Sequence, residues 1–293
     1  MNAIDSVAPR MPQAPATPLP PGACDSHTHV FGPFDRFPLA QPSSYPLPMA
    51  PAALHAQMLD TVGAARGVLV QPAPYGSDPA PMLAALALSG GRLRGVGVAD
   101  ATISVAELTR WSEAGIRGLR FVEMRDPKGQ RYAGSVDTTH LAALAPAMRA
   151  LGMHAQLWAS AADYQRLLPA LLALDVPLVL DHMGCFDIAR GPADAAFVHL
   201  LERLRAGQVW IKLSLCRVSK QAPSYDDLRP FHDAMVAANP ARLLWGSDWP
   251  FVRMGDNAPD AGALLDLFAA WVPDPAVRRQ ILVDNPALLY GFV

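Results

Sequence analysis

Short apolar runs alternate with amphipathic stretches of helix length from residue 23 to the end of the chain. Most of the runs are continuously apolar rather than alternating in polarity, which is typical of parallel strands covered on both faces. Eight runs have the length of a strand, and they read CDSHTHV, RGVLVQPA, LRGVGVAD, IRGLRFVE, HAQLWAS, PLVLDHMG, VWIKLSL and RLLWGSDWP. Eight strands that alternate with helices predict a single-domain (β/α)₈ barrel, of the TIM-barrel α/β class, over residues 23–293.

The stretches between the runs carry signals for the ends of helices. Ser104 and Glu107 have the spacing of a capping box, and Gly115 is a typical stop. Asp137 is a candidate N-cap for the next helix, in which Pro146 is expected to cause a kink or strain. These signals support helices in the positions that a barrel requires.

An open doubly wound sheet is the alternative fold. The chain has no GxGxxG after the first predicted strand and no P-loop, which disfavours that alternative. The first 22 residues are rich in proline and predict an extended N-terminal arm. This arm could be a flexible tail, or it could pack on the barrel or on a neighbouring molecule.

Polar residues stand at the carboxyl ends of the predicted strands, where a (β/α)₈ barrel places its active site. Taken singly, each has a structural explanation: a histidine can be a hydrogen-bonded core residue, Asp248 can cap a turn, and Arg217 can cover the rim. Together they converge on one cavity if the barrel closes. These residues are His27, His29, Gln71, Arg120, Gln156, Trp158, His182, Ser214, Cys216, Arg217 and Asp248.

The combination of HxH after the first strand, DHMG after the sixth and GSDWP after the eighth resembles the amidohydrolase superfamily. The similarity extends over nearly the whole chain from about residue 23, and it is greatest to the branch of 2-pyrone-4,6-dicarboxylate lactonase. The stretches that carry it are CDSHTHVFGP, GVLVQPAPYGSD, LRGVGV, GIRGLRF, LVLDHMG, LLWGSDWP and LVDNPALLYGF.

The resemblance has consequences for metal binding. Members of the superfamily usually hold one or two divalent ions, but this chain has no lysine at the end of the fourth strand, and its fifth strand offers Gln156 and Trp158 at the mouth. A binuclear centre is therefore not expected. His27, His29, His182 and Asp248 could hold one divalent ion such as zinc. Because the similar pyrone lactonases work without a metal, we expect a reaction that requires no cofactor.

The resemblance also implies a mechanism of lactone hydrolysis. Asp248 would be the base that activates water, with a pKa raised by burial toward the working range. His27, His29 and His182 would stabilise the negative charge that develops on the carbonyl oxygen. The same Asp248 could return its proton to the leaving ring oxygen.

Substrate recognition is expected to involve arginine, whose planar group pairs with carboxylates. By resemblance, Arg120, Arg217 and Tyr45 are the residues expected to contact the substrate. Arg125 is a candidate for a second carboxylate-binding arginine, although its alignment with the family is uncertain. Gln71, at the end of the second strand, is a further candidate. Glu123 and Asp126 would repel a dianion if they faced the pocket, and Trp158 stands where the pyrone lactonase has a tyrosine. Pyrone-dicarboxylate-like, muconolactone-like and sugar-acid lactones all remain open as substrates.

Two other classes of function remain open: a metal-dependent decarboxylase of the same superfamily, and a non-catalytic barrel. The net charge of −2 gives no reason to expect nucleic acid or a membrane as a partner, so a small molecule is expected. Three cysteines without metal-site spacing and the lack of a signal-like start predict a cytoplasmic protein. The sequence leaves a homo-oligomer open.

Overall fold

The predicted barrel is confirmed by the computed structural model, which describes residues 6–40, 43, 45–126 and 128–293. Eight parallel strands lie in one sheet in their order along the chain. All eight are short, and almost all of their residues are buried. They are β2 (Cys24–Thr28), β4 (Arg66–Val70), β5 (Leu93–Gly97), β6 (Ile116–Val122), β7 (His154–Trp158), β8 (Leu178–Leu180), β9 (Val209–Leu213) and β10 (Leu243–Trp245).

The sheet closes between its first strand, β2, and its last strand, β10, just beyond their carboxyl ends. The backbone N–H of Asp248 donates to the carbonyl of His27 at 2.8 Å, and that of His29 donates to the carbonyl of Trp249 at 2.9 Å. These bonds join two segments that are more than two hundred residues apart. Closure therefore places the HxH segment directly beside Asp248.

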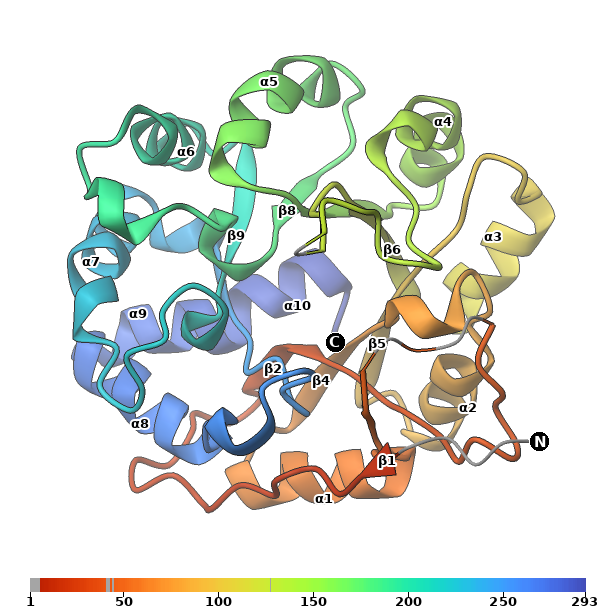
Figure 1. Ribbon diagram of the computed structural model, residues 1–293, viewed down its shortest axis with the longest axis horizontal. Coiled ribbons are helices and arrows are strands. Elements are labelled where there is room, and N and C mark those ends of the chain that lie inside the picture. The colour runs from red at the N-terminus through yellow and green to blue at the C-terminus, as the bar shows by residue number, and fades with distance from the viewer. Residues whose placement is uncertain (1–5, 41–42, 44, 127) are drawn as a thin grey trace.

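A ring of helices surrounds the strands (Figure 1). The helix α3 begins as predicted, because the side chain of Ser104 accepts from the backbone N–H of Glu107. Within the part of the chain that the structure describes, no helix is both long and apolar enough to cross a bilayer. The larger helices are α1 (Ala52–Val62), α2 (Ala80–Leu88), α3 (Val105–Glu113), α4 (Leu141–Ala150), α5 (Ala161–Leu172), α6 (Ala195–Arg205), α7 (Arg229–Ala238) and α8 (Ala261–Trp271).

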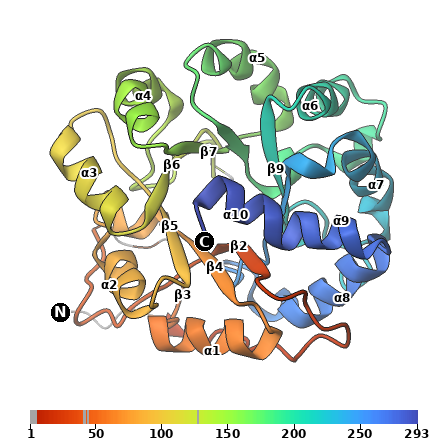
Figure 2. The same ribbon diagram turned by 180° about the vertical axis from the view of Figure 1, so that it is seen from behind.

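The C-terminal segment covers the barrel at the amino ends of the strands. Helices α9 (Pro275–Arg279) and α10 (Asn285–Tyr290) run across this end (Figure 2). Arg94, near the start of β5, donates to the carbonyls of Tyr290 and Gly291 at 3.2 and 2.9 Å. The amino ends of the strands are thus covered, and the polar residues singled out from the sequence lie at the opposite end of the barrel.

The N-terminal segment packs along the outside of the barrel. Strand β1 (Ser6–Val7) pairs in parallel with β3 (Leu47–Pro48), and residues 8–20 contain no helix or strand. The backbone N–H groups of Ala16 and Thr17 both donate to the carboxylate of Asp266 on α8 at 2.9 Å. Residues 1–5 of the predicted arm lie outside the described residues, and a boundary at residue 22 stays a prediction.

Buried histidines outside the mouth of the barrel predict a pH-dependent stability. The ring of His232 on α7 lies 5.0 Å from that of Trp271, and burial lowers its pKa to about 4 against the opposing effect of Asp233. Below pH 6.5 the unfolded chain therefore binds a proton that the folded chain does not, so stability falls as pH falls toward 4. A shift of this size corresponds to about 3 kcal/mol.

We expect His232→Phe to remove this contribution, because phenylalanine keeps the aromatic contact and cannot titrate. Urea unfolding of the wild type and the variant at several pH values between 7 and 4 would measure it. The free energy of unfolding of His232→Phe should rise steadily relative to that of the wild type as pH falls. A gap independent of pH would contradict the prediction.

Candidate active site

Three imidazoles and one carboxylate meet at the carboxyl ends of the strands. His27 and His29 are at the end of β2, His182 follows β8, and Asp248 follows β10, and all four are buried. The Nε2 atoms of His27 and His29 lie 3.2 and 3.1 Å from Oδ1 of Asp248. The ring of His182 is centred 4.9 Å from that of His27. The structure therefore brings together the four residues that the sequence singled out.

Two of these residues have an unusual backbone. Asp248 and His182 adopt φ angles of +67° and +50°, in the left-handed region that side chains other than glycine rarely occupy. Such conformations carry a free-energy cost and cluster at functional sites. At these two strand ends the left-handed turn accompanies side chains that lie at the barrel mouth.

The carboxylate of Asp248 is divided between two kinds of partner. Its Oδ1 faces the two imidazoles, and its Oδ2 accepts from Nε of Arg217. Burial alone would raise the pKa of this carboxyl, but Arg217 and the imidazoles outweigh it and hold the pKa well below its usual range. The expectation that burial raises this pKa was wrong, because it took no account of an ion pair with Arg217.

A second buried carboxylate lies beneath the first. Asp181, the last residue before His182, has its Oδ1 3.2 Å from Nδ1 of His27 and 3.6 Å from Nζ of Lys212. Lys212 also donates to Oε1 of Gln156 at 2.6 Å, and the amide of Gln156 donates to Asp181 at 3.2 Å. Burial lowers the pKa of Lys212 to about 8 despite the attraction of Asp181.

The partners of the ring nitrogens differ between His29 and His27. Nδ1 of His29 lies 2.7 Å from the carbonyl oxygen of Val70 and therefore donates to it. Nδ1 of His27 lies 3.2 Å from Oδ1 of Asp181 and 3.4 Å from Nζ of Lys212. Burial and Lys212 hold the pKa of His27 well below its usual value, so this ring is neutral near pH 7. Its Nε2 lies 3.2 Å from Oδ1 of Asp248 and has no hydrogen-bond partner among the described residues.

His182 is the imidazole that remains available to a substrate. Burial lowers its pKa to about 4, so the ring is neutral near pH 7. Its buried Nδ1 has no hydrogen-bond partner among the described residues. Of the three histidines expected to donate to an oxyanion, both ring nitrogens of His29 are hydrogen-bonded, whereas Nε2 of His27, like Nδ1 of His182, has no partner among the described residues. His182 lines the pocket and His27 does not.

A pocket at the mouth of the barrel contains Asp248, His29 and His182. Three further residues expected to contact substrate, Arg120, Trp158 and Tyr45, also line it, together with Arg217. It opens outward into a cavity of about 1170 Å³ that shares Trp158, His182 and Arg217 with it. The structure therefore places most of the expected residues around one accessible space.

Two residues expected to contact substrate do not reach the pocket. The amide of Gln71 donates to the carbonyls of Gly76 and Asp78 at 2.7 and 3.0 Å, and its oxygen accepts from Val98. Gln71 is thus fully engaged in holding the loop after β4. Arg125 is exposed on the loop after β6 and does not line the pocket.

The acidic residues of the same loop do not oppose an anionic substrate. Glu123 accepts from the backbone N–H of Thr138 at 2.9 Å, and Asp126 accepts from the backbone of Lys128 and Gln130. Both carboxylates are occupied by these bonds and neither lines the pocket. Repulsion of a dianion, which the sequence raised as a concern, is therefore not built into this loop.

The structure also adds residues that the sequence reading missed. Asp181 and Lys212 lie beneath the site, and Tyr132 and Arg253 line the pocket. A charged residue inside the apolar run VWIKL, and an aspartate directly before the DHMG histidine, were the available signals for Lys212 and Asp181. Tyr132 and Arg253 lie in loops, where no periodic pattern marks them.

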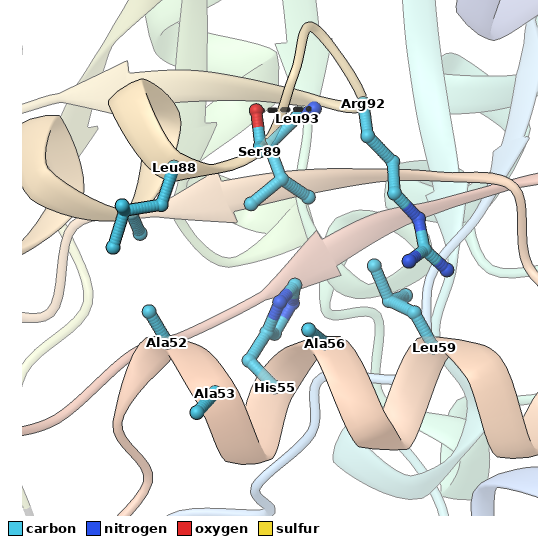
Figure 3. A pocket seen from close by; sticks show the side chains of 10 residues that line it. Ala52, Ala53, His55, Ala56, Leu59, Leu88, Ser89, Arg92 and Leu93 are labelled. Atoms are coloured by element: carbon cyan, nitrogen blue, oxygen red, sulfur yellow. Dashed lines mark hydrogen bonds between the residues drawn. The ribbon is translucent and has the colours of Figure 1, made fainter.

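Another cavity, of about 330 Å³, lies between α1 and α2 on the outside of the barrel (Figure 3). His55 lines it together with Leu59, Leu88 and Arg92. The Nε2 atom of His55 is bonded to the hydroxyl of Thr28 at 2.8 Å, and burial lowers the pKa of this histidine to about 3. None of the candidate catalytic residues lines this cavity.

The donor atoms at the mouth match a metal site in kind. Ligand atoms of His27, His29 and Asp248 lie within 4.8 Å of one another, and so do those of His27, Asp181 and His182. Imidazole and carboxylate donors suit zinc. Arg217 and Lys212 already pair with the two carboxylates, however, and a divalent ion would lie beside these buried cations at an electrostatic cost.

Comparison with known proteins identifies the family. Residues 24–292 match the model of the amidohydrolase family (Amidohydro_2), and the chain belongs to this family. It is 36% identical over 290 residues to a 2-pyrone-4,6-dicarboxylate hydrolase of Comamonas testosteroni, covering 95% of this chain and 93% of the relative. It is 34% identical to a 4-sulfomuconolactone hydrolase of Rhizobium radiobacter, covering 97% and 95%.

A solved structure supports the same assignment. A probable 2-pyrone-4,6-dicarboxylic acid hydrolase of Acinetobacter baumannii, with citric acid bound, is 27% identical and has a TM-score of 0.80. The similarity covers 92% of this chain and all of that one. The resemblance drawn from the sequence is thus confirmed, and so is the class of hydrolase that acts on carboxylic esters in lactone rings.

The buried pair of Lys212 and Asp181 yields a prediction about stability. Lys212→Met should destabilise the fold by about 3 kcal/mol, because it leaves a buried carboxylate without its ammonium partner. Asp181→Asn in the same chain should restore part of this loss, since it removes the unpaired charge. The free energies of urea unfolding of the wild type, both single variants and the double variant form a double-mutant cycle that measures the interaction. Strictly additive losses would show that the two groups do not interact.

Proposed function

We propose that this protein hydrolyses the ring ester of an anionic lactone, with Asp248 as the base that activates water. The observation that carries the proposal is the placement of an ionised, buried carboxylate between two imidazoles at the mouth of a pocket lined by three arginines. The named relatives act on 2-pyrone-4,6-dicarboxylate and on 4-sulfomuconolactone. Both support a ring lactone that carries an acidic substituent.

In the proposed reaction Asp248 removes a proton from water while the oxygen attacks the lactone carbonyl carbon. The proton is shared between Oδ1 of Asp248 and the Nε2 atoms of His27 and His29, which lie 3.2 and 3.1 Å away. This sharing stabilises the protonated state of a carboxyl whose resting pKa is low. The ring C–O bond then breaks, and the proton passes to the leaving oxygen.

The charge on the carbonyl oxygen is stabilised by donors around the pocket. His182 and Arg120 line it, and the buried Nδ1 of His182 and Nε of Arg120 have no partner among the described residues. A buried donor without a partner carries a desolvation cost that a substrate oxygen would remove. We assign His182 to the oxyanion and Arg120 to a substrate carboxylate.

The aromatic residues complete the binding site. Trp158 stacks on Tyr132 at 5.2 Å between ring centres, and Tyr45 lines the same pocket. A flat aromatic wall suits a planar or nearly planar ring. A cytoplasmic location stays a prediction from the sequence alone.

Turnover of a panel of lactones would test the proposal. The panel should include 2-pyrone-4,6-dicarboxylate, a muconolactone and an uncharged lactone, with acid release followed by a pH indicator. We expect hydrolysis of at least one acidic lactone and at least a thousandfold loss in Asp248→Asn, because the amide cannot accept the proton of water. Circular dichroism should show that the variant is folded. A folded variant with near-normal turnover would exclude Asp248 as the base.

The pairing of Asp248 with Arg217 and of Asp181 with Lys212 favours a reaction that needs no metal. If an ion were bound, His27, His29 and Asp248 would hold it, and it would supply Lewis acidity to the carbonyl. We expect dialysis against a strong chelator to leave kcat and KM unchanged, with less than one-tenth of a metal ion per chain by elemental analysis. Loss of activity that zinc restores would contradict this and favour a metal-dependent reaction, including decarboxylation.

A further inference from the structure

Three guanidinium groups line the pocket, and two of them already have carboxylate partners. Nη2 of Arg120 lies 3.3 Å from Oδ2 of Asp181, and Nε of Arg217 donates to Asp248. The third belongs to Arg253, on the loop that follows β10. Within the described part of the chain, no carboxylate oxygen lies within 4 Å of this group.

The backbone holds Arg253 over the pocket. The segment from Asp248 to Arg253 contains three residues with left-handed φ angles, of which Arg253 is one at +68°. Nη1 of Arg217 donates to the carbonyl of Val252 at 2.8 Å while Nε of the same side chain binds Asp248. The loop that carries Arg253 is thereby tied to the catalytic carboxylate through one side chain.

Aromatic rings fix the direction of the Arg253 side chain. Its guanidinium carbon lies 4.9 Å from the ring centre of Tyr132 and 5.8 Å from those of Tyr45 and Trp158. Nη1 donates to the hydroxyl of Tyr132 at 2.7 Å. Contact with aromatic faces restrains a guanidinium and leaves the in-plane N–H groups that do not bind Tyr132 to pair with an anion.

We propose that Arg253 is a specificity-determining residue that binds an acidic substituent of the substrate on the outer side of the lactone ring. This inference rests on the proposed function and goes further by naming the group that is recognised. The ring would lie against Trp158 with its carbonyl toward Asp248, and the outer carboxylate or sulfonate would pair with Arg253. An uncharged lactone would gain nothing from this residue.

The test combines binding and turnover in Arg253→Met, Arg253→Lys and a matched control, Arg205→Met. Arg205 is an exposed arginine at the end of α6, away from the pocket. Citrate serves as a non-reacting polycarboxylate probe in calorimetry. We expect its Kd to rise about tenfold in Arg253→Met and severalfold in Arg253→Lys, as expected for loss of a charged hydrogen-bonding partner. Arg205→Met should match the wild type.

The kinetic constants should also differ between acidic and uncharged lactones in Arg253→Met. On a carboxylated lactone, Arg253→Met should raise KM about tenfold and change kcat less than threefold, because the residue contacts a part of the substrate that does not react. A sulfonated lactone tests whether the recognised group is a carboxylate or a sulfonate. The group that Arg253 recognises is the one carried by the lactone whose KM rises most in Arg253→Met. On an uncharged lactone the variant and the wild type should be equal.

The outcomes separate this inference from the proposed function. Wild-type hydrolysis with an unchanged KM in Arg253→Met would keep the lactonase and overturn the role of Arg253. Weakened citrate binding without hydrolysis of any lactone would keep an anion site at Arg253 and overturn the lactonase. Equal citrate affinity in the wild type and Arg253→Met, or no saturable binding by either, would overturn the inference.

Discussion

Two buried carboxylates, each paired with a cation, hold the mouth of this barrel together. Asp248 pairs with Arg217, and Asp181 pairs with Lys212 and with Arg120. His27 stands between the two carboxylates, 3.2 Å from each. Removal of charged groups from water is costly, so this arrangement persists only because each charge finds a partner of opposite sign. The position of every group that reacts depends on this network.

The same network connects stability with chemistry. Closure of the sheet brings β2 against the segment after β10, where the carboxylate of Asp25 accepts from the backbone N–H groups of His27 and Ser247. Arg217 binds both Asp248 and the backbone of the loop that carries Arg253. One guanidinium thus fixes the base and the outer wall of the pocket, so a change at Arg217 would alter both.

The low pKa of Asp248 and the imidazole nitrogens beside it act together in the proposed reaction. A carboxylate that stays ionised is ready to accept a proton, but a low pKa alone makes it a weak base. In the proposed reaction the neighbouring imidazole nitrogens share the proton once it arrives, and a substrate anion that pairs with Arg217 would weaken the effect of this arginine on the pKa of Asp248. The substrate itself would then help to activate its own base.

The sequence by itself determined the fold and the set of polar residues that meet at the barrel mouth. Eight apolar runs separated by helices have few solutions other than a barrel, and the fold requires polar residues such as His27 and Asp248 at strand ends to converge. The tertiary structure decided which partners these residues have. The pairing of Asp248 with Arg217, the burial of Lys212 beneath His27, the engagement of Gln71 with its own loop and the placement of Arg253 over Trp158 are contacts between distant segments. Their distances and charges follow from packing, which local sequence patterns do not encode.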